Sequence, residues 1–119
     1  MARLDMVGGE VRVRFSAWER LAVWREDVVV PPAAIRAVEY VESPVGRARG
    51  GRAGVLVSGV LKVGFWGLGT GVRQLVSVRR GVPAVRVEVD RAASGLHFDE
   101  LLISTPNAVE VADALAVRV

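Results

Sequence analysis

Seven strand-like segments are followed by one amphipathic segment at the C-terminal end, and this order constrains the fold more than any other feature. Thr105-Pro106-Asn107 is a helix start, with Thr105 as N-cap and Pro106 at N1, where a missing N–H costs nothing. One helical face then collects the apolar residues Val109, Ala112, Leu115, Ala116 and Val119. A helix placed there can cover the open end of a sheet that curls into a small barrel.

The composition favours one β-rich domain without redox or disulfide chemistry. A chain of 119 residues suits a single domain, and its 25 valines favour strands. It has no cysteine, which excludes disulfides and thiolate chemistry. Residues 1–10 contain no long apolar stretch of the kind found in signal peptides, so we expect a cytoplasmic protein.

Alternation of apolar and polar residues, together with short apolar runs, predicts the strands. They are Glu10–Phe15, Asp27–Pro31, Arg36–Glu42, Val55–Gly69, Val72–Val78, Ala84–Asp90 and His97–Ser104. We expect Val55–Gly69 to be one strand kinked at Gly59. Val72–Val78 and Ala84–Asp90 are expected to form a hairpin, with Leu75, Val85, Val87 and Val89 facing inward. Residues 1–9 are predicted to be a loose leader, and residues 10–119 one domain.

Two connections between these strands carry local signals. Ser16-Ala17-Trp18-Glu19 is a capping-box pattern, which favours a short helix over Ala17–Val23. A strand through Leu21–Trp24 is the alternative, and the sequence leaves the choice open. Ser43–Gly54 is rich in Gly, Pro and Arg, so we expect the longest irregular loop there.

Strands closed by a C-terminal helix are the order of the pleckstrin-homology (PH) superfold, and several blocks of residues extend this resemblance. Asp27-Val28-Val29-Val30-Pro31 followed by Ile35-Arg36-Ala37-Val38-Glu39 resembles the opening of small bacterial PH-like proteins. Later blocks resemble an uncharacterised, mostly actinobacterial group: Gly51–Gly54, Val63–Phe65, Val76–Val85 and Leu101–Pro106. The resemblance implies about seven antiparallel strands in a partly open barrel with one C-terminal helix. It implies no established activity.

The residues also depart from the lipid-binding members of that superfold. Eukaryotic PH domains that bind phosphoinositides place basic residues around the first hairpin loop. In the corresponding region here, Ser16–Asp27, Arg20 and Arg25 are offset by Glu19, Glu26 and Asp27. The tryptophan usual in the C-terminal helix is absent from Ala108–Val119. An inositol-lipid site therefore cannot be carried over, and fold analogy alone supplies no function.

The charges are segregated along the chain. Residues 43–87 hold eight cations and no carboxylate, while the rest holds eight cations and thirteen carboxylates, a net charge of −5. This basic region could attract anions, and its candidate contact residues are Arg47, Arg49, Arg52, Arg79 and Arg80. The alternative is that acidic and basic strands neutralise each other in space, which is the commoner outcome.

Residues that could support catalysis are sparse. His97 is the only histidine, and Asp99, two residues away on a strand, lies on the same face and forms no triad. His97, Asp99 and Glu100 alone make a poor metal site. Gly67-Leu68-Gly69-Thr70-Gly71 is not followed by a helix pattern, so it predicts a turn and not a phosphate loop. We expect no enzyme, no metal and no cofactor.

An interaction domain is the leading functional hypothesis. It would bind a protein partner, or a second copy as a homo-oligomer, through an open strand edge or the groove beside the terminal helix. Trp66, on a glycine-rich stretch, is the expected exposed aromatic residue. One alternative is recognition of an acidic membrane by the basic region; nucleic acid is less favoured because few aromatic residues accompany the arginines. Another is small-molecule binding in the barrel mouth.

Overall fold

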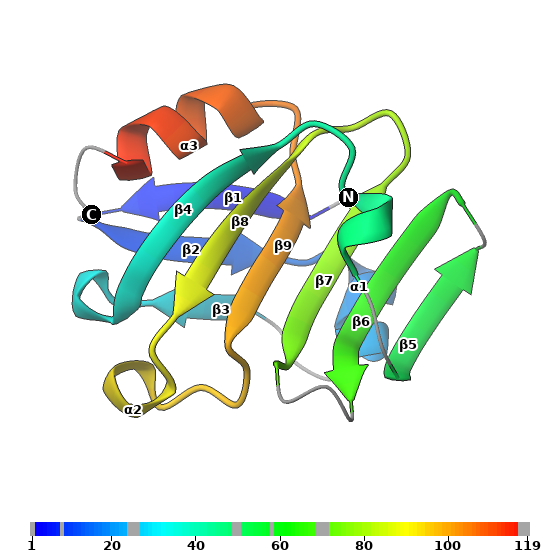
Figure 1. Cartoon of the computed structure of the whole chain (residues 1–119), viewed down its shortest axis with the longest axis horizontal. Coiled ribbons are helices and arrows are strands. Elements are labelled where there is room, and N and C mark those ends of the chain that lie inside the picture. Colours follow the sequence, from blue (N-terminus) through cyan, green and yellow to red (C-terminus); the bar gives the residue numbers. More distant parts are fainter. Residues whose placement is uncertain are drawn as a thin grey trace.

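The first three strands form a small antiparallel sheet of their own. The structure is a computed structural model that describes residues 2–7, 9–23, 27–48, 51–57, 59–68 and 72–116. Within this sheet the strands lie in chain order (Figure 1): β1 (Arg3–Val7), β2 (Glu10–Arg14) and β3 (Asp27–Val30).

The N-terminal segment is more ordered than the sequence suggests. Residues 1–9 are expected to form a loose leader, whereas β1 occupies residues 3–7 and pairs with β2. Leu4 lies opposite Val13, and it is buried at 1% exposure. Pairing with β2 and the burial of Ala2 and Leu4 in the main core hold β1 in place.

Six strands form the second sheet, in the order β4-β8-β9-β7-β6-β5. They are β4 (Ile35–Val41), β5 (Gly51–Val57), β6 (Leu61–Leu68), β7 (Gln74–Arg79), β8 (Ala84–Val89) and β9 (Glu100–Ser104). The β7–β9 pair is parallel, and the other pairs are antiparallel. β4 and β5 are therefore the two outer strands of this sheet (Figure 1).

The predicted hairpin of Val72–Val78 with Ala84–Asp90 is wrong, because β9 lies between β7 and β8 and pairs with both. All five residues of β9 are buried, a pattern typical of a central strand covered on both faces. The turn after β7 reverses the chain, but it leaves β8 far enough from β7 for β9 to lie between them. The inward face predicted for this region is confirmed, since Leu75, Val85, Val87 and Val89 are all buried.

The segment Val55–Gly69 is also two strands and not one. β5 ends at Val57 and β6 begins at Leu61, with Gly59 in the turn at a φ of 72°. A positive φ suits glycine in a tight turn. The expected loop Ser43–Gly54 is shorter than predicted, because it contains the 3₁₀ helix η2 (Val45–Arg47) and β5 begins at Gly51.

The short helices follow local capping signals. α1 (Ala17–Val23) forms where the capping box predicts it, which settles the choice between helix and strand. The Ser16 N–H donates to Glu19 Oε1 at 3.1 Å. η1 (Pro32–Ala34) turns the chain into β4, and α2 (Arg91–Ser94) begins after Asp90, whose carboxylate accepts from two backbone N–H groups.

The C-terminal helix α3 (Ala108–Ala116) packs against β4, β8 and β1. It begins two residues after the predicted start at Pro106. Its buried residues are Ala108, Val111, Ala112 and Leu115. Val109, expected on the inner face, is 53% exposed, because the buried residues follow an i, i+3, i+4, i+7 spacing from Ala108 and Val109 lies beside that stripe.

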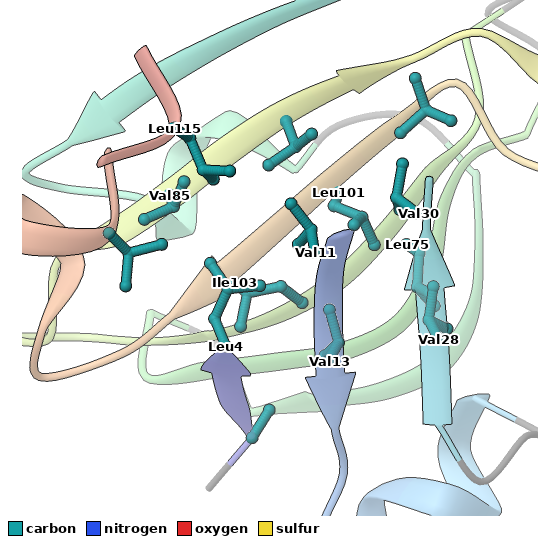
Figure 2. Close-up of a cluster of buried hydrophobic side chains, with 14 of the residues drawn as sticks. Leu4, Val11, Val13, Val28, Val30, Leu75, Val85, Leu101, Ile103 and Leu115 are labelled. Carbon is teal, nitrogen blue, oxygen red and sulfur yellow. The ribbon is translucent and has the colours of Figure 1, made fainter. Parts of the chain in front are cut away.

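The main core lies between the two sheets and under α3. Figure 2 shows side chains of the small sheet meeting those of the large sheet, with Leu115 of α3 beside them. The large-sheet residues labelled there are Leu75, Val85, Leu101 and Ile103. The fold is mainly β with a C-terminal helix, as predicted, but the sheets do not close into a barrel. The parallel β7–β9 pair also departs from the expected antiparallel arrangement.

Candidate functional site

The outer strand β5 presents an apolar edge to solvent. Val55 is 40% exposed, Leu56 37% and Val57 48%, and Val60 in the following turn is 48% exposed. In the described part of the chain, β5 pairs with β6 alone and is the last strand of its sheet. Such an edge offers unpaired backbone groups to another strand. We call Val55, Leu56, Val57 and Val60 the β5 edge surface.

A close approach of two glycines holds β5 against β6. Gly54 lies opposite Gly64. A Cβ atom added to Gly54 would lie 2.2 Å from the Val63 carbonyl oxygen and 2.7 Å from Gly64 Cα, which is closer than van der Waals contact allows. Gly64 has a φ of 139°, a conformation that L side chains rarely adopt. The edge strand is thus held by a contact that only glycine permits.

Helix α1 lies beside this edge and adds an aromatic side chain. It packs against β6 and β5. Trp18 is 38% exposed, and the Arg79 guanidinium carbon lies 5.9 Å from the centre of its ring. Arg79 is opposite Leu61 of β6, which is opposite Val57 of β5. The face of β5 and β6 on which α1 packs therefore presents a row of apolar side chains that ends at Trp18 and Arg79.

A buried carboxylate fixes α1 in this position. Glu19 is fully buried, and it accepts hydrogen bonds from the Ser16 hydroxyl at 2.6 Å and from the Ser77 hydroxyl of β7. Burial acts to raise the pKa of Glu19, but the hydrogen bonds from Ser16 and Ser77 outweigh it and leave that pKa below its usual value. Glu19 therefore stays ionised at neutral pH and joins α1 to a central strand.

The candidate anion-contacting arginines that the structure describes lie in different surroundings. Arg47 is neutralised by Glu39, its guanidinium donating two hydrogen bonds at 3.1 and 3.2 Å. This pairing, mainly through the hydrogen bonds, lowers the pKa of Glu39. Arg79 lies against Trp18, and Arg80 is exposed in the turn after β7. Arg52 is a residue of β5, and Arg49 lies outside the described residues.

The second sheet face carries a smaller core that includes Trp66. Its buried members are Val41, Ala48, Trp66, Val76, Val78, Ala84 and Leu102. Trp66 is 3% exposed, so the surface position expected for it is corrected to a buried one. The chain covers this face with the segment around η2, whose backbone accepts hydrogen bonds from Lys62 at 2.7 Å and Gln74 at 2.9 Å. Trp66 is buried despite the glycines beside it in the sequence, because the segment around η2 lies over this face of the sheet.

Other kinds of site have little support. Among the residues described, no group of three or more His, Asp or Glu side chains is arranged to hold a metal ion. His97 is exposed, and Asp99 pairs with Arg91 at 2.8 Å. A cleft of about 360 Å³ lies where β1 meets the start of α3, between Arg3–Asp5 and Thr105–Asn107. No helix in the described ranges is long and apolar enough to cross a membrane.

Sequence reasoning missed both the location of the edge and the exposure of Trp18. The signal for the edge lies in Val55-Leu56-Val57-Ser58-Gly59, three apolar residues followed by Ser and Gly, but the sequence predicts this stretch as the first part of a single strand, Val55–Gly69. Comparison with known protein families, curated proteins and solved structures finds no match to this chain. The candidate site therefore rests on its own geometry.

Proposed function

We propose that this chain is a protein-interaction domain that binds an extended polypeptide segment by strand addition along β5. The observation that carries the proposal is an outer strand of seven residues with Val55, Leu56 and Val57 all more than a third exposed. Strand addition draws its affinity from main-chain hydrogen bonds, and side-chain contacts give specificity. A chain with few residues suited to chemistry can serve this function.

The alternatives have less support. Arg47 is paired with Glu39, which weakens the case for a membrane-binding surface made of the predicted arginines. A small-molecule site in a barrel mouth lacks the closed barrel it requires. The resemblance to PH-like proteins stays a prediction, and the proposal does not rest on it.

A proline pair tests the proposal. Successive backbone N–H groups along an antiparallel strand point alternately to either side, so proline at Val55 and at Leu56 removes an inward N–H in one variant and an outward N–H in the other. The probe is a fluorescent seven-residue peptide of alternating threonine and valine, which is uncharged and as long as β5. We expect one proline variant to keep the native circular dichroism and lose peptide binding measured by fluorescence anisotropy.

The mass of the chain is measured in parallel by light scattering. A concentration-dependent dimer that the same proline variant abolishes would also support pairing at β5. Peptide binding and mass that both proline variants leave unchanged would overturn the proposal.

A further inference from the structure

Among the described residues, four cations of residues 43–87 belong to the half of the large sheet that ends in β5: Arg52, Lys62, Arg79, and Arg80 in the turn after β7. β5, β6 and β7 are consecutive at that end of the sheet, and none of them contains Asp or Glu. Two cations of the region are neutralised from elsewhere, Arg47 by Glu39 and Arg86 by Glu100. Both pairs involve carboxylates on the β4–β8–β9 half of the sheet. Carboxylates therefore balance more of the positive charge on the β4–β8–β9 half of the sheet than on the β5–β7 half.

Three other cations of the region lie close to the β5 edge surface. Arg79 has a buried Nε atom without a hydrogen-bond partner among the described residues, and its guanidinium lies against Trp18. Arg80 is exposed, and its backbone N–H donates at 2.7 Å to the carbonyl of Val60, in the turn that follows β5. Lys62 of β6 lies opposite Leu56. Each is within two strands of the open edge.

The two faces of this edge differ in chemistry. Val55 and Val57 lie opposite Val63 and Leu61, on the face where α1 packs and where Trp18 is exposed. Leu56 lies opposite Lys62, on the other face. Because alternate residues of a strand point to opposite faces, a bound strand would place every second side chain on the apolar face and the rest on the Lys62 face.

We propose, on the basis of strand addition at β5, that the occupant is an extended segment of another polypeptide in which apolar residues alternate with aspartate or glutamate. Apolar side chains pack beside Val55, Val57 and Trp18, and the carboxylates approach Lys62 on the other face and the exposed Arg80 in the nearby turn. A second copy fits this edge less well, since pairing β5 with itself joins two half-sheets whose strands β5–β7 carry cations and no carboxylate. Opposite charges across paired strands stabilise the pair, and like charges oppose it.

Two labelled peptides as long as β5 test this inference on the full chain. One alternates glutamate with valine, and the other lysine with valine. At low ionic strength we expect the glutamate peptide to bind about tenfold or more tightly than the lysine peptide, with the difference shrinking at high salt as the charges are screened. Arg80→Glu should weaken glutamate-peptide binding severalfold. Arg3→Glu, the same charge change at an exposed residue of the small sheet, should leave it unchanged.

The outcomes separate this inference from strand addition itself. Equal binding of both peptides, or equal weakening by the two charge reversals, would overturn the acidic partner and leave strand addition intact. Binding of neither peptide, with a dimer that β5 variants abolish, would make the second copy the occupant. Binding of neither peptide by a chain that stays monomeric at every concentration would overturn the inference and strand addition together.

Discussion

The two outer strands of the large sheet hold equivalent positions but differ in protection. β4 follows Pro31 and Pro32, has an irregular register between Ile35 and Ala37, and is covered in part by α3. β4 also contains charged residues, among them Arg36, which pairs with Asp90 at 2.9 Å. β5 has seven residues, including three exposed apolar ones. Irregularity, charge and a covering helix are the usual means of blunting a strand edge.

The contrast between β4 and β5 shows that the open edge of this sheet lies at β5. Because β4 shows that the same sheet can protect an outer strand, the exposure of β5 is not a general feature of this fold. The glycine contact between Gly54 and Gly64 and the fixed position of α1 keep β5 ordered while its outer side faces solvent.

Replacing Gly54 with alanine should have the largest effect. The added Cβ collides with the Val63 carbonyl, 2.2 Å away, so β5 must shift away from β6. We expect the free energy of unfolding to fall by about 3 kcal/mol, at the upper end of the cost of overpacking. Urea unfolding measures this loss. Gly46→Ala is the matched control, because no atom lies within 4 Å of its added Cβ, and an equal loss in both variants would refute the close approach.

Replacing Glu19 with alanine should come next. The substitution removes the carboxylate that the Ser16 and Ser77 hydroxyls donate to, and it leaves the buried Ser77 hydroxyl without that partner. We expect a loss of about 1–3 kcal/mol in the free energy of unfolding, with faster amide exchange in α1 and little change in β4. Equal loosening of α1 and β4 would show that Glu19 supports the fold in general and not this edge.

Lowering the pH should weaken the attachment of α1 to β7 through Glu19. The native pKa of Glu19 is lowered, so the ionised form stabilises the folded state. This contribution is complete above the ordinary glutamate pKa of about 4.3 and is lost as the pH falls through the lower native value. The free energy of unfolding should therefore fall with decreasing pH more steeply in the unmodified chain than in Glu19→Gln. Parallel pH profiles for the two proteins would contradict the assigned role.

Charge at the edge should alter binding while leaving stability almost unchanged. Val57→Lys places a lysine on an exposed position, so the free energy of unfolding should change by less than about 0.5 kcal/mol. Binding of the uncharged threonine–valine peptide should fall, because a charged side chain protects a strand edge. The matched control is Val109→Lys on α3, a valine that is also about half exposed. Equal binding by both variants would place the peptide site elsewhere.

Local patterns predicted the elements better than their partners. The Ser16–Glu19 capping box gave α1 with its correct bounds, and alternation predicted the strand that includes β2, where Val11 and Val13 are buried. Pairing was harder, because β9 enters between β7 and β8 from about 20 residues downstream of β7, and no turn signal encodes such an insertion. The sequence reveals an apolar run more readily than the neighbours that will cover it.

The residues of the candidate site were also hard to predict, because their surroundings depend on strand pairing. Trp66 lies among glycines and was expected at the surface, but the segment around η2 covers it, while Trp18 of α1 stays partly exposed. Arg47 belongs to the basic stretch, yet its partner Glu39 lies on β4, eight residues earlier. Exposure and ion pairing both depend on which strands become neighbours, so the composition of a segment could not locate the edge.

Amide hydrogen exchange, measured by NMR on the dilute chain with and without the threonine–valine peptide, tests strand addition at β5. We expect alternate amides of β5 to exchange rapidly in the free chain and to slow down when the peptide binds, while those of β4 are unchanged. Protection that appears on β4 or α3 in place of β5, or β5 amides that are all slow in the free monomer, would contradict it.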